Sequence, residues 1–396
     1  MKSILVIFLF GIPLLALAAK GGHFPAETRM VTNESDYSVL QLTTNLADDA
    51  VIYFTNEAYS PSDNMLVFTS KRSGAWNLFG LDLKSYEIVQ LTDSKHIQGT
   101  GAVVAPQTRE VFFKDGDHIK ALSLMTLAER VVVDLPKGFI NSAAVTASPD
   151  GKVIALSQTE DISITTKTDI IYSDLNERFE KRPFSQIFTG NGDGSDWHMV
   201  AGQKKWVSHA LLAPKAPYTL LYCHEGAWER VEQRMWLIQR NNMYNRKLRE
   251  EEKPDLLIGH EYFFPDGVHV GYHGNYASPD KRSFIGIADI RDGVYNEYIT
   301  PDGNRHTHAN ADGTLFVGDG NPRAPFISVY ALHDGKLEPI LQFRHDGSWD
   351  KQEWHPHPRF LPDGRRIVFA SNKGGDGNIY LLTLKKNMPN ARIQKE

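Results

Sequence analysis

A tight-turn signal recurs seven times along the chain, and this repeat constrains the fold more than any other feature. The turns are centred on these pairs: Ser62-Asp63, Pro106-Gln107, Pro149-Asp150, Pro214-Lys215, Pro265-Asp266, Ala311-Asp312 and Pro362-Asp363. Their second members lie 44, 43, 65, 51, 46 and 51 residues apart. Short alternating apolar segments, which are typical of β-strands, follow the turns. The spacing is that of a four-stranded propeller blade, so the sequence predicts an all-β, seven-bladed β-propeller.

The two ends of the repeat array indicate how the ring closes. The segment 37–43 (YSVLQLT) closely copies 86–92 (YEIVQLT), which we expect to be the outer strand of blade one. No blade precedes the first copy, and the last blade runs out after three strands near Leu384. We therefore expect the N-terminal strand to complete blade seven and to cover its open edge. The spacing of 65 predicts an insertion in blade three, around Asp161 to Trp197.

The first residues read as a leader. A lysine at position 2 precedes an apolar run and small residues that suit cleavage, so we predict a signal peptide over residues 1–19. Residues 20–396 then form a single propeller domain, periplasmic or secreted, with no membrane attachment after cleavage. The net charge of −5 offers no general basic field for nucleic acid. Cys223, the only cysteine, rules out an intramolecular disulfide and is expected to be a small buried residue.

Histidines occupy one register of the repeat. Counting back six residues from the second turn residue gives these positions in blades four to seven: His209, His260, His306 and His357. The same count in blades one to three gives Glu57, Gly101 and Ala144. Equivalent positions on successive inner strands lie around one end of the central channel. The sequence therefore predicts an imidazole cluster at that end.

Neighbouring residues extend this cluster into a candidate metal site. His355 projects to the same side of an extended strand as His357, and Gln352 can join them if the chain turns there. With His306 these residues form an uncharged ligand set, so a bound divalent first-row metal would keep nearly its full charge for an anionic ligand. The blade-four loop bounded by His224 and Arg234 is expected at the same end.

Several of these stretches together resemble the oligogalacturonate lyase family, seven-bladed propellers of pectin breakdown. They are 223–226 (CHEG), 234–238 (RMWLI), 260–267 (HEYFFPDG), 306 with 312–320 (DGTLFVGDG), and 352–358 (QEWHPHP). The resemblance implies that manganese is held by His306, Gln352, His355 and His357. It also implies that His260 is the catalytic base and Arg234 the accompanying substrate-binding and catalytic arginine. The family is usually cytoplasmic, whereas a leader predicts export.

These residues suit the β-elimination of a 4-linked uronate. The C5 proton is poorly acidic because charge develops beside the carboxylate, and a metal on that carboxylate stabilises the developing charge. A neutral His260 then takes the proton, and Arg234 can pair with a carboxylate in a two-pronged geometry. The group that protonates the leaving oxygen stays open among water, Arg234 and protonated His260. The expected partner is an acidic oligosaccharide, oligogalacturonate or a related uronate.

Further residues and two rival functions complete the predictions. His209, His224, Arg72 and Trp76 are candidates for contact with the sugar chain. The first rival is a non-catalytic periplasmic propeller of the TolB-like type, acting as a protein- or glycan-binding scaffold, which would not need the histidines. The second is a hydrolase, but no Gly-x-Ser-x-Gly stretch is present, and a glycosidase needs two facing carboxyl groups where the repeat places histidines.

Overall fold

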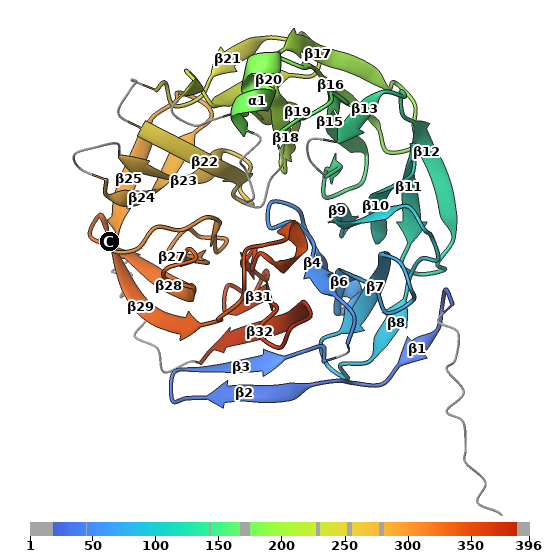
Figure 1. Cartoon of the computed structure of the whole chain (residues 1–396), viewed down its shortest axis with the longest axis vertical. Coiled ribbons are helices and arrows are strands. Elements are labelled where there is room, and N and C mark those ends of the chain that lie inside the picture. The colour runs from blue at the N-terminus through green and yellow to red at the C-terminus, as the bar shows by residue number, and fades with distance from the viewer. Residues whose placement is uncertain are drawn as a thin grey trace, which may run out of the picture.

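A computed structural model gives the structure of the chain. It describes residues 19–44, 46–141, 144–166, 175–226, 230–251, 256–276 and 281–385. The predicted signal peptide thus falls almost entirely outside the described residues. Strands in the described part form seven antiparallel sheets arranged in a ring about a centre (Figure 1). The predicted seven-bladed propeller is confirmed. No helix in these ranges is long and apolar enough to cross a membrane.

The first three blades hold the N-terminal half of the ring. Blade one contains β4 (Asp49–Val51), β5 (Tyr59–Ser60), β6 (Met65–Ser70), β7 (Asn77–Asp82), β8 (Ile88–Gln90) and, outermost, β1 (His23–Phe24). Blade two contains β9 (Ile97–Ala105), β10 (Glu110–Asp115), β11 (His118–Ser123) and β12 (Glu129–Asp134). Blade three contains β13 (Phe139–Asn141), β14 (Thr146–Ala147), β15 (Val153–Glu160), β16 (Phe184–Asn191) and β17 (His198–Lys204).

The remaining blades carry the residues predicted to be functional. Blade four contains β18 (Val207–Ala213), β19 (Ala216–His224), β20 (Met235–Gln239) and β21 (Asn245–Lys247). Blade five contains β22 (Leu256–Phe263), β23 (His269–Tyr276), β24 (Ser283–Asp289) and β25 (Tyr295–Thr300). Blade six contains β26 (Thr307–Ala309), β27 (Leu315–Gly318), β28 (Phe326–His333) and β29 (Lys336–Arg344). Blade seven contains β30 (Arg359–Phe360), β31 (Arg366–Ser371), β32 (Asn378–Leu384), β3 (Tyr37–Gln41) and β2 (Arg29–Asn33).

The N-terminal segment closes the ring as predicted. β3 pairs with β32 from Tyr37 opposite Leu384 to Gln41 opposite Tyr380, and β2 then adds an unexpected outer strand. Figure 1 shows these two strands of the chain start lying beside the strands of its end. Pairing β3 with β32 covers the edge of the last blade and joins segments from near both ends of the described chain in one sheet.

The repeated turns have a specific local cause. In the turn after each of several inner strands, an aspartate accepts hydrogen bonds from backbone amides two or three residues ahead, as Asp266 does from Val268 and His269 at 2.9 and 3.0 Å. The next residue is a glycine with positive φ, such as Gly267 at 74° and Gly364 at 67°. Aspartate supplies the turn acceptor and glycine the left-handed backbone, which explains why this pair recurs.

The blade-three insertion lies between β15 and β16. It carries the helix α1 (Leu175–Lys181), the one α-helix among the described residues. Phe179 on α1 stacks under the guanidinium of Arg230 at 4.7 Å, and Arg178 lies 5.4 Å from the ring of Trp206. The insertion therefore packs on the loop of blade four that leads to Arg234.

Candidate active site

The histidine register of the repeat coincides with breaks in the strand pairing. The β18–β19 pairing shifts between Ser208 and Leu211, and the β22–β23 pairing shifts between Gly259 and Tyr262. His209 and His260 lie in these bulges with φ values of 51° and 52°, and His357 has φ 44°. Left-handed backbone is uncommon for residues other than glycine and stores strain, of order 1–3 kcal/mol, that is typical of functional sites. The bulges re-aim the side chains, which strict alternation along a strand would not predict.

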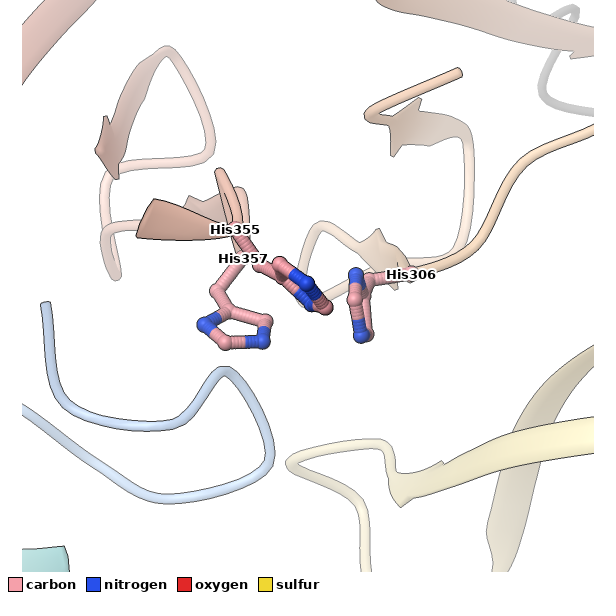
Figure 2. Close-up of side chains that lie close together, drawn as sticks. All are labelled: His306, His355 and His357. Carbon is pink, nitrogen blue, oxygen red and sulfur yellow. The ribbon is translucent and has the colours of Figure 1, made fainter. Parts of the chain in front are cut away.

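Three of the histidines converge. His306, His355 and His357 each offer a ring nitrogen within 4.8 Å of the others, and all three residues are at most 1% exposed (Figure 2). His306 precedes β26, whereas the other two precede β30. The three-residue 3₁₀ turn Gln352–Trp354 breaks the extended chain and brings the side-chain amide nitrogen of Gln352 to 3.3 Å from His357 Nε2. All four predicted metal ligands therefore lie together.

The atoms of this cluster fit a metal ion. His306 Nδ1 lies 2.6 Å from Asp319 Oδ2, and His355 Nε2 lies 3.2 Å from the carbonyl oxygen of Trp349. Each ring keeps one buried nitrogen without a hydrogen-bond partner: His306 Nε2, His355 Nδ1 and His357 Nδ1. Buried polar atoms without partners are rare in folded proteins. Burial lowers the pKa of all three rings, so they are neutral and offer lone pairs to a divalent cation.

His260 lies directly beside this cluster. Its ring centroid is 4.4 Å from that of His306, and its Nδ1 is 3.0 Å from His273 Nε2. Burial lowers its pKa well below the usual value, and the nearby rings and Arg234 add to the shift. In the tautomer in which His260 Nδ1 donates to His273, Nε2 is the atom that can accept a proton from a ligand. His273 was not predicted as a site residue; it faces Gly259 across the bulged strand pair, and burial lowers its pKa to about 4.

Arg234 is held by two carboxylates that sequence reasoning missed. Its guanidinium donates Nε to Glu261 Oε1 and Nη1 to Glu225 Oε2, the latter at 3.1 Å. Arg234 is 3% exposed. Since its donors are engaged, the structure does not offer this guanidinium for the two-pronged pairing with a substrate carboxylate that we expected. Each glutamate directly follows a histidine that the sequence singled out, His224 or His260, and that adjacency was the one available signal.

His209 and His224 have different surroundings. His209 lies between the Arg234 network and the cluster, with Nδ1 3.4 Å from Glu261 Oε2 and its ring 5.7 Å from that of His260. His224 packs against Trp236 at 5.1 Å between ring centroids and is 7% exposed. Burial lowers the pKa of His224 to about 4. His209 therefore belongs to the site, whereas His224 lies in the wall of blade four.

The two candidates from blade one, Trp76 and Arg72, also have different surroundings. Trp76 is partly exposed. It lies beside the turn that carries Gln352, since both contact the same glycine: a Cβ added to Gly99 would come within 2.5 Å of Glu353 Cγ and 3.2 Å of Trp76 Cε2. The Arg72 side chain is instead only 5% exposed, pairs with Glu27 at 2.9 Å and Asp49 at 3.1 Å, and packs on aromatic rings of blade one. Arg72 thus ties the N-terminal segment to the blade, and the expectation that it contacts substrate is corrected.

Replacing Arg72 with methionine is expected to destabilise the fold without affecting substrate binding. Asp49 is 0% exposed, so the change would leave a buried carboxylate without its cation. Removing one partner of a buried ion pair typically lowers the free energy of unfolding by about 3–5 kcal/mol. Urea denaturation measures this loss, and KM should stay within about twofold of wild type. The exposed Arg323→Met is the control, and a large rise in KM with unchanged stability would contradict the assignment.

Burial of histidines should make the chelator-treated protein acid-sensitive. Burial lowers the pKa of His224, His260, His273, His306, His308, His345, His355 and His357. The unfolded chain then binds more protons than the folded one below pH 6.5, so stability falls as pH falls, by about 1.4 kcal/mol per pH unit for each extra proton. Asp49 and Asp319, whose pKa burial raises to about 6, act in the opposite direction but are fewer. Thermal melting should therefore occur at a lower temperature at pH 5 than at pH 7, and an equal or higher melting temperature at pH 5 would refute this.

Comparisons with known proteins identify the family of the chain. The sequence model of the family described as oligogalacturonate lyase matches residues 32–388. The chain is 25% identical over 358 residues to the oligogalacturonide lyase of Pectobacterium atrosepticum, covering 85% of this chain and 91% of that protein. It is 26% identical over 350 residues to the oligogalacturonate lyase of Dickeya dadantii, covering 83% and 88%.

Solved structures give the same result. An oligogalacturonate lyase in complex with manganese superposes with a TM-score of 0.84 at 25% identity, covering 93% of this chain and 99% of that one. The oligogalacturonate lyase of Vibrio parahaemolyticus also has a TM-score of 0.84, at 22% identity, and shares the fold. Because the family match spans nearly the whole propeller, the chain belongs to the oligogalacturonate lyase family.

Proposed function

We propose that this protein cleaves 4-linked oligouronates of the oligogalacturonate type by β-elimination and leaves an unsaturated uronate end. The observation that carries the proposal is a neutral histidine, His260, placed beside three buried imidazoles that each keep one nitrogen without a partner. Uncharged ligands and an uncharged base suit the removal of a proton next to a carboxylate. Membership of a lyase family supports the same reaction class.

A divalent metal would be held by His306, His355, His357 and the amide of Gln352. When bound there it would act as a Lewis acid toward the uronate carboxylate, with its charge undiminished by the protein ligands. Manganese is favoured, since a similar solved lyase contains it, although an N/O site of this kind also accepts other first-row divalent ions. Asp319 orients His306 through Nδ1, so that Nε2 is the ligand atom.

His260 would remove the C5 proton through Nε2. Its lowered pKa keeps it unprotonated at neutral pH, and His273 fixes the orientation of its ring. Arg234 would act as a positioning residue rather than by direct pairing with the sugar. It holds Glu261, which in turn contacts His209, and its positive charge disfavours protonation of His260.

Trp76 would provide a flat face for a sugar ring at the rim of the site, with Lys71 Nζ 4.8 Å from its ring to attract an acidic chain. The predicted leader places this activity in the periplasm or outside the cell. A secreted or periplasmic enzyme would meet uronate fragments before their import.

The proposal is tested by incubating the purified protein with oligogalacturonates, oligomannuronates and oligoguluronates, with and without a chelator. Elimination creates a C4–C5 double bond that absorbs in the ultraviolet, whereas hydrolysis of the same chains gives no such absorbance. We expect absorbance with oligogalacturonate, its loss with chelator, and its return with added Mn²⁺. Chain shortening without ultraviolet absorbance would contradict the proposal in favour of a hydrolase, and no cleavage at all would favour a scaffold.

A further inference from the structure

A short turn from blade one enters the centre of the ring beside the histidines. The turn 53–56 follows β4, and Asn56 N donates to the Tyr53 carbonyl at 2.8 Å. Its inner side is partly exposed at Tyr53, while Thr55, Asn56 and Glu57 line a cavity at the opposite mouth of the channel. The turn therefore separates the candidate active site from the rest of the channel.

Neighbouring blades hold this turn in place. Tyr53 N donates to the Thr100 carbonyl at 3.2 Å, and Asn56 Nδ2 donates to the carbonyls of Ala102 and Val145 at 2.9 and 2.8 Å. Arg359 Nη1 donates to the Phe54 carbonyl at 2.7 Å. Phe54 is 0% exposed, and its ring packs 5.3 Å from that of His306. With contacts from blades two, three and seven, the turn is a rigid support for Tyr53.

The Tyr53 side chain extends from this turn to the histidines. Its ring centroid is 4.8 Å from that of His357 and 6.2 Å from that of His306. Its hydroxyl is 3.5 Å from His209 Nε2, and His209 Nδ1 lies 3.4 Å from Glu261. The Tyr53 hydroxyl thus lies between the candidate metal ligand His357 and His209, the histidine next to the proposed base.

Two other side chains that could protonate the leaving oxygen, Arg234 and His260, are poorly suited to do so. The N–H groups of Arg234 serve Glu225 and Glu261, and a guanidinium does not release a proton to a sugar oxygen. His260 receives a proton in the same reaction and would have to deliver it to the oxygen on the neighbouring carbon. The Tyr53 phenol carries a proton of its own, so it could protonate the leaving oxygen without any proton passing through His260.

We propose that Tyr53 is the general acid that protonates the leaving oxygen, an inference that rests on the proposed elimination. The C5–H bond breaks and its proton goes to His260, while the electron pair forms the C4–C5 double bond. The C4–O bond breaks, and the leaving oxygen takes the phenolic proton of Tyr53. The tyrosinate oxygen then lies beside His209 Nε2. Solvent returns one proton to Tyr53 and removes one from His260, which restores the enzyme.

The test compares Tyr53→Phe on two substrates that differ in their leaving group. On trigalacturonate the leaving oxygen is an alkoxide that needs a proton, and we expect kcat to fall by about 10²–10⁴-fold. On a galacturonoside that carries a 4-nitrophenyl ether at C4, the leaving nitrophenolate needs no proton, and we expect a loss of less than about tenfold. Manganese content and melting temperature should match wild type. Tyr59→Phe, which removes a hydroxyl bonded to Asn64, is the matched control.

Each outcome decides the question. A large loss on trigalacturonate with near-normal cleavage of the aryl ether supports the acid role, whereas an equal loss on both substrates shows that Tyr53 is structural and overturns it. A Tyr53→Phe enzyme that keeps wild-type kcat on trigalacturonate also overturns it while leaving the elimination intact. If wild type forms no unsaturated product from either substrate, the proposed function fails and the Tyr53 assignment fails with it.

Discussion

Replacement of His260 by alanine is expected to lower kcat for unsaturated product by about 10⁴-fold and to leave manganese binding unchanged. The change removes the group that takes the C5 proton, and general base catalysis contributes up to about that factor. The metal should stay because His306, His355 and His357 retain their nitrogens without His260. Ultraviolet absorbance measures turnover, and metal analysis of the same preparation measures manganese.

Two further variants test whether a loss of activity in His260→Ala comes from misfolding. His260 has φ 52°, and asparagine tolerates that backbone better than alanine does, so His260→Asn should fold at least as well and be equally inactive. The partly exposed His269→Ala in the same blade should be fully active, since that ring pairs with Asp266 in the turn of blade five, away from the histidine cluster. An active His260→Ala protein would remove this residue from the mechanism.

The ring could be predicted from the sequence because each blade carries its own local signal. The aspartate of a repeated turn binds backbone amides just ahead of it, and the glycine after it takes positive φ, as at Asp266 and Gly267. Such contacts depend on a few neighbouring residues, so the repeat spacing is readable directly. The pairing of β3 with β32 followed from the same logic, because a ring of blades leaves one edge to cover.

The sequence predicted the centre of the site from the repeat, and His355 and Gln352 from their closeness to His357 along the chain. His209, His260, His306 and His357 share one register, and the structure brings them to one end of the channel. The groups around them do not follow the register. Glu225 and Glu261 matter because bulges and loops turn them toward Arg234, and Tyr53 matters because a non-strand turn carries it inward. The spacing of residues along the sequence does not show which way these side chains point.

The prediction for Arg72 failed for a related reason. A basic residue in a loop at the site end looks available to an acidic sugar, but its partners Glu27 and Asp49 lie 45 and 23 residues away in sequence. An ion pair between distant residues cannot be read from a single sequence. The charge of Arg234, close to the proposed base, is likewise balanced by carboxylates that a single sequence does not reveal as its partners.

The histidine cluster also separates an enzyme from a scaffold. A protein-binding propeller has no reason to keep three buried imidazole nitrogens without partners, since each unpaired buried polar atom costs about 1–3 kcal/mol. Left-handed backbone at His209, His260 and His357 adds further strain. These costs are understandable if the cluster binds an ion that supplies the missing interactions, so metal removal should weaken the fold as well as the activity.

Replacing His355 with alanine is therefore expected to abolish both metal binding and turnover, unlike the loss of His260. Only two imidazoles and the amide of Gln352 would remain, and even changes to groups that merely orient a ligand typically weaken affinity by about 10–100-fold. We expect a larger loss here, seen as manganese absent after gel filtration and as no rise in melting temperature on adding Mn²⁺. For wild type, metal at a hundred times its Kd should add about 2.7 kcal/mol to the free energy of unfolding.

Graded variants make the assignment specific to this cluster. Asp319→Asn should fall between wild type and His355→Ala, because it weakens the orientation of His306 while every ligand nitrogen remains. The exposed His333→Ala should bind manganese normally, since its ring lies at a hairpin of blade six beside Asp334. If His355→Ala bound manganese with wild-type affinity, the ion would have to sit elsewhere. The convergence of the three buried imidazoles would then have no part in the elimination.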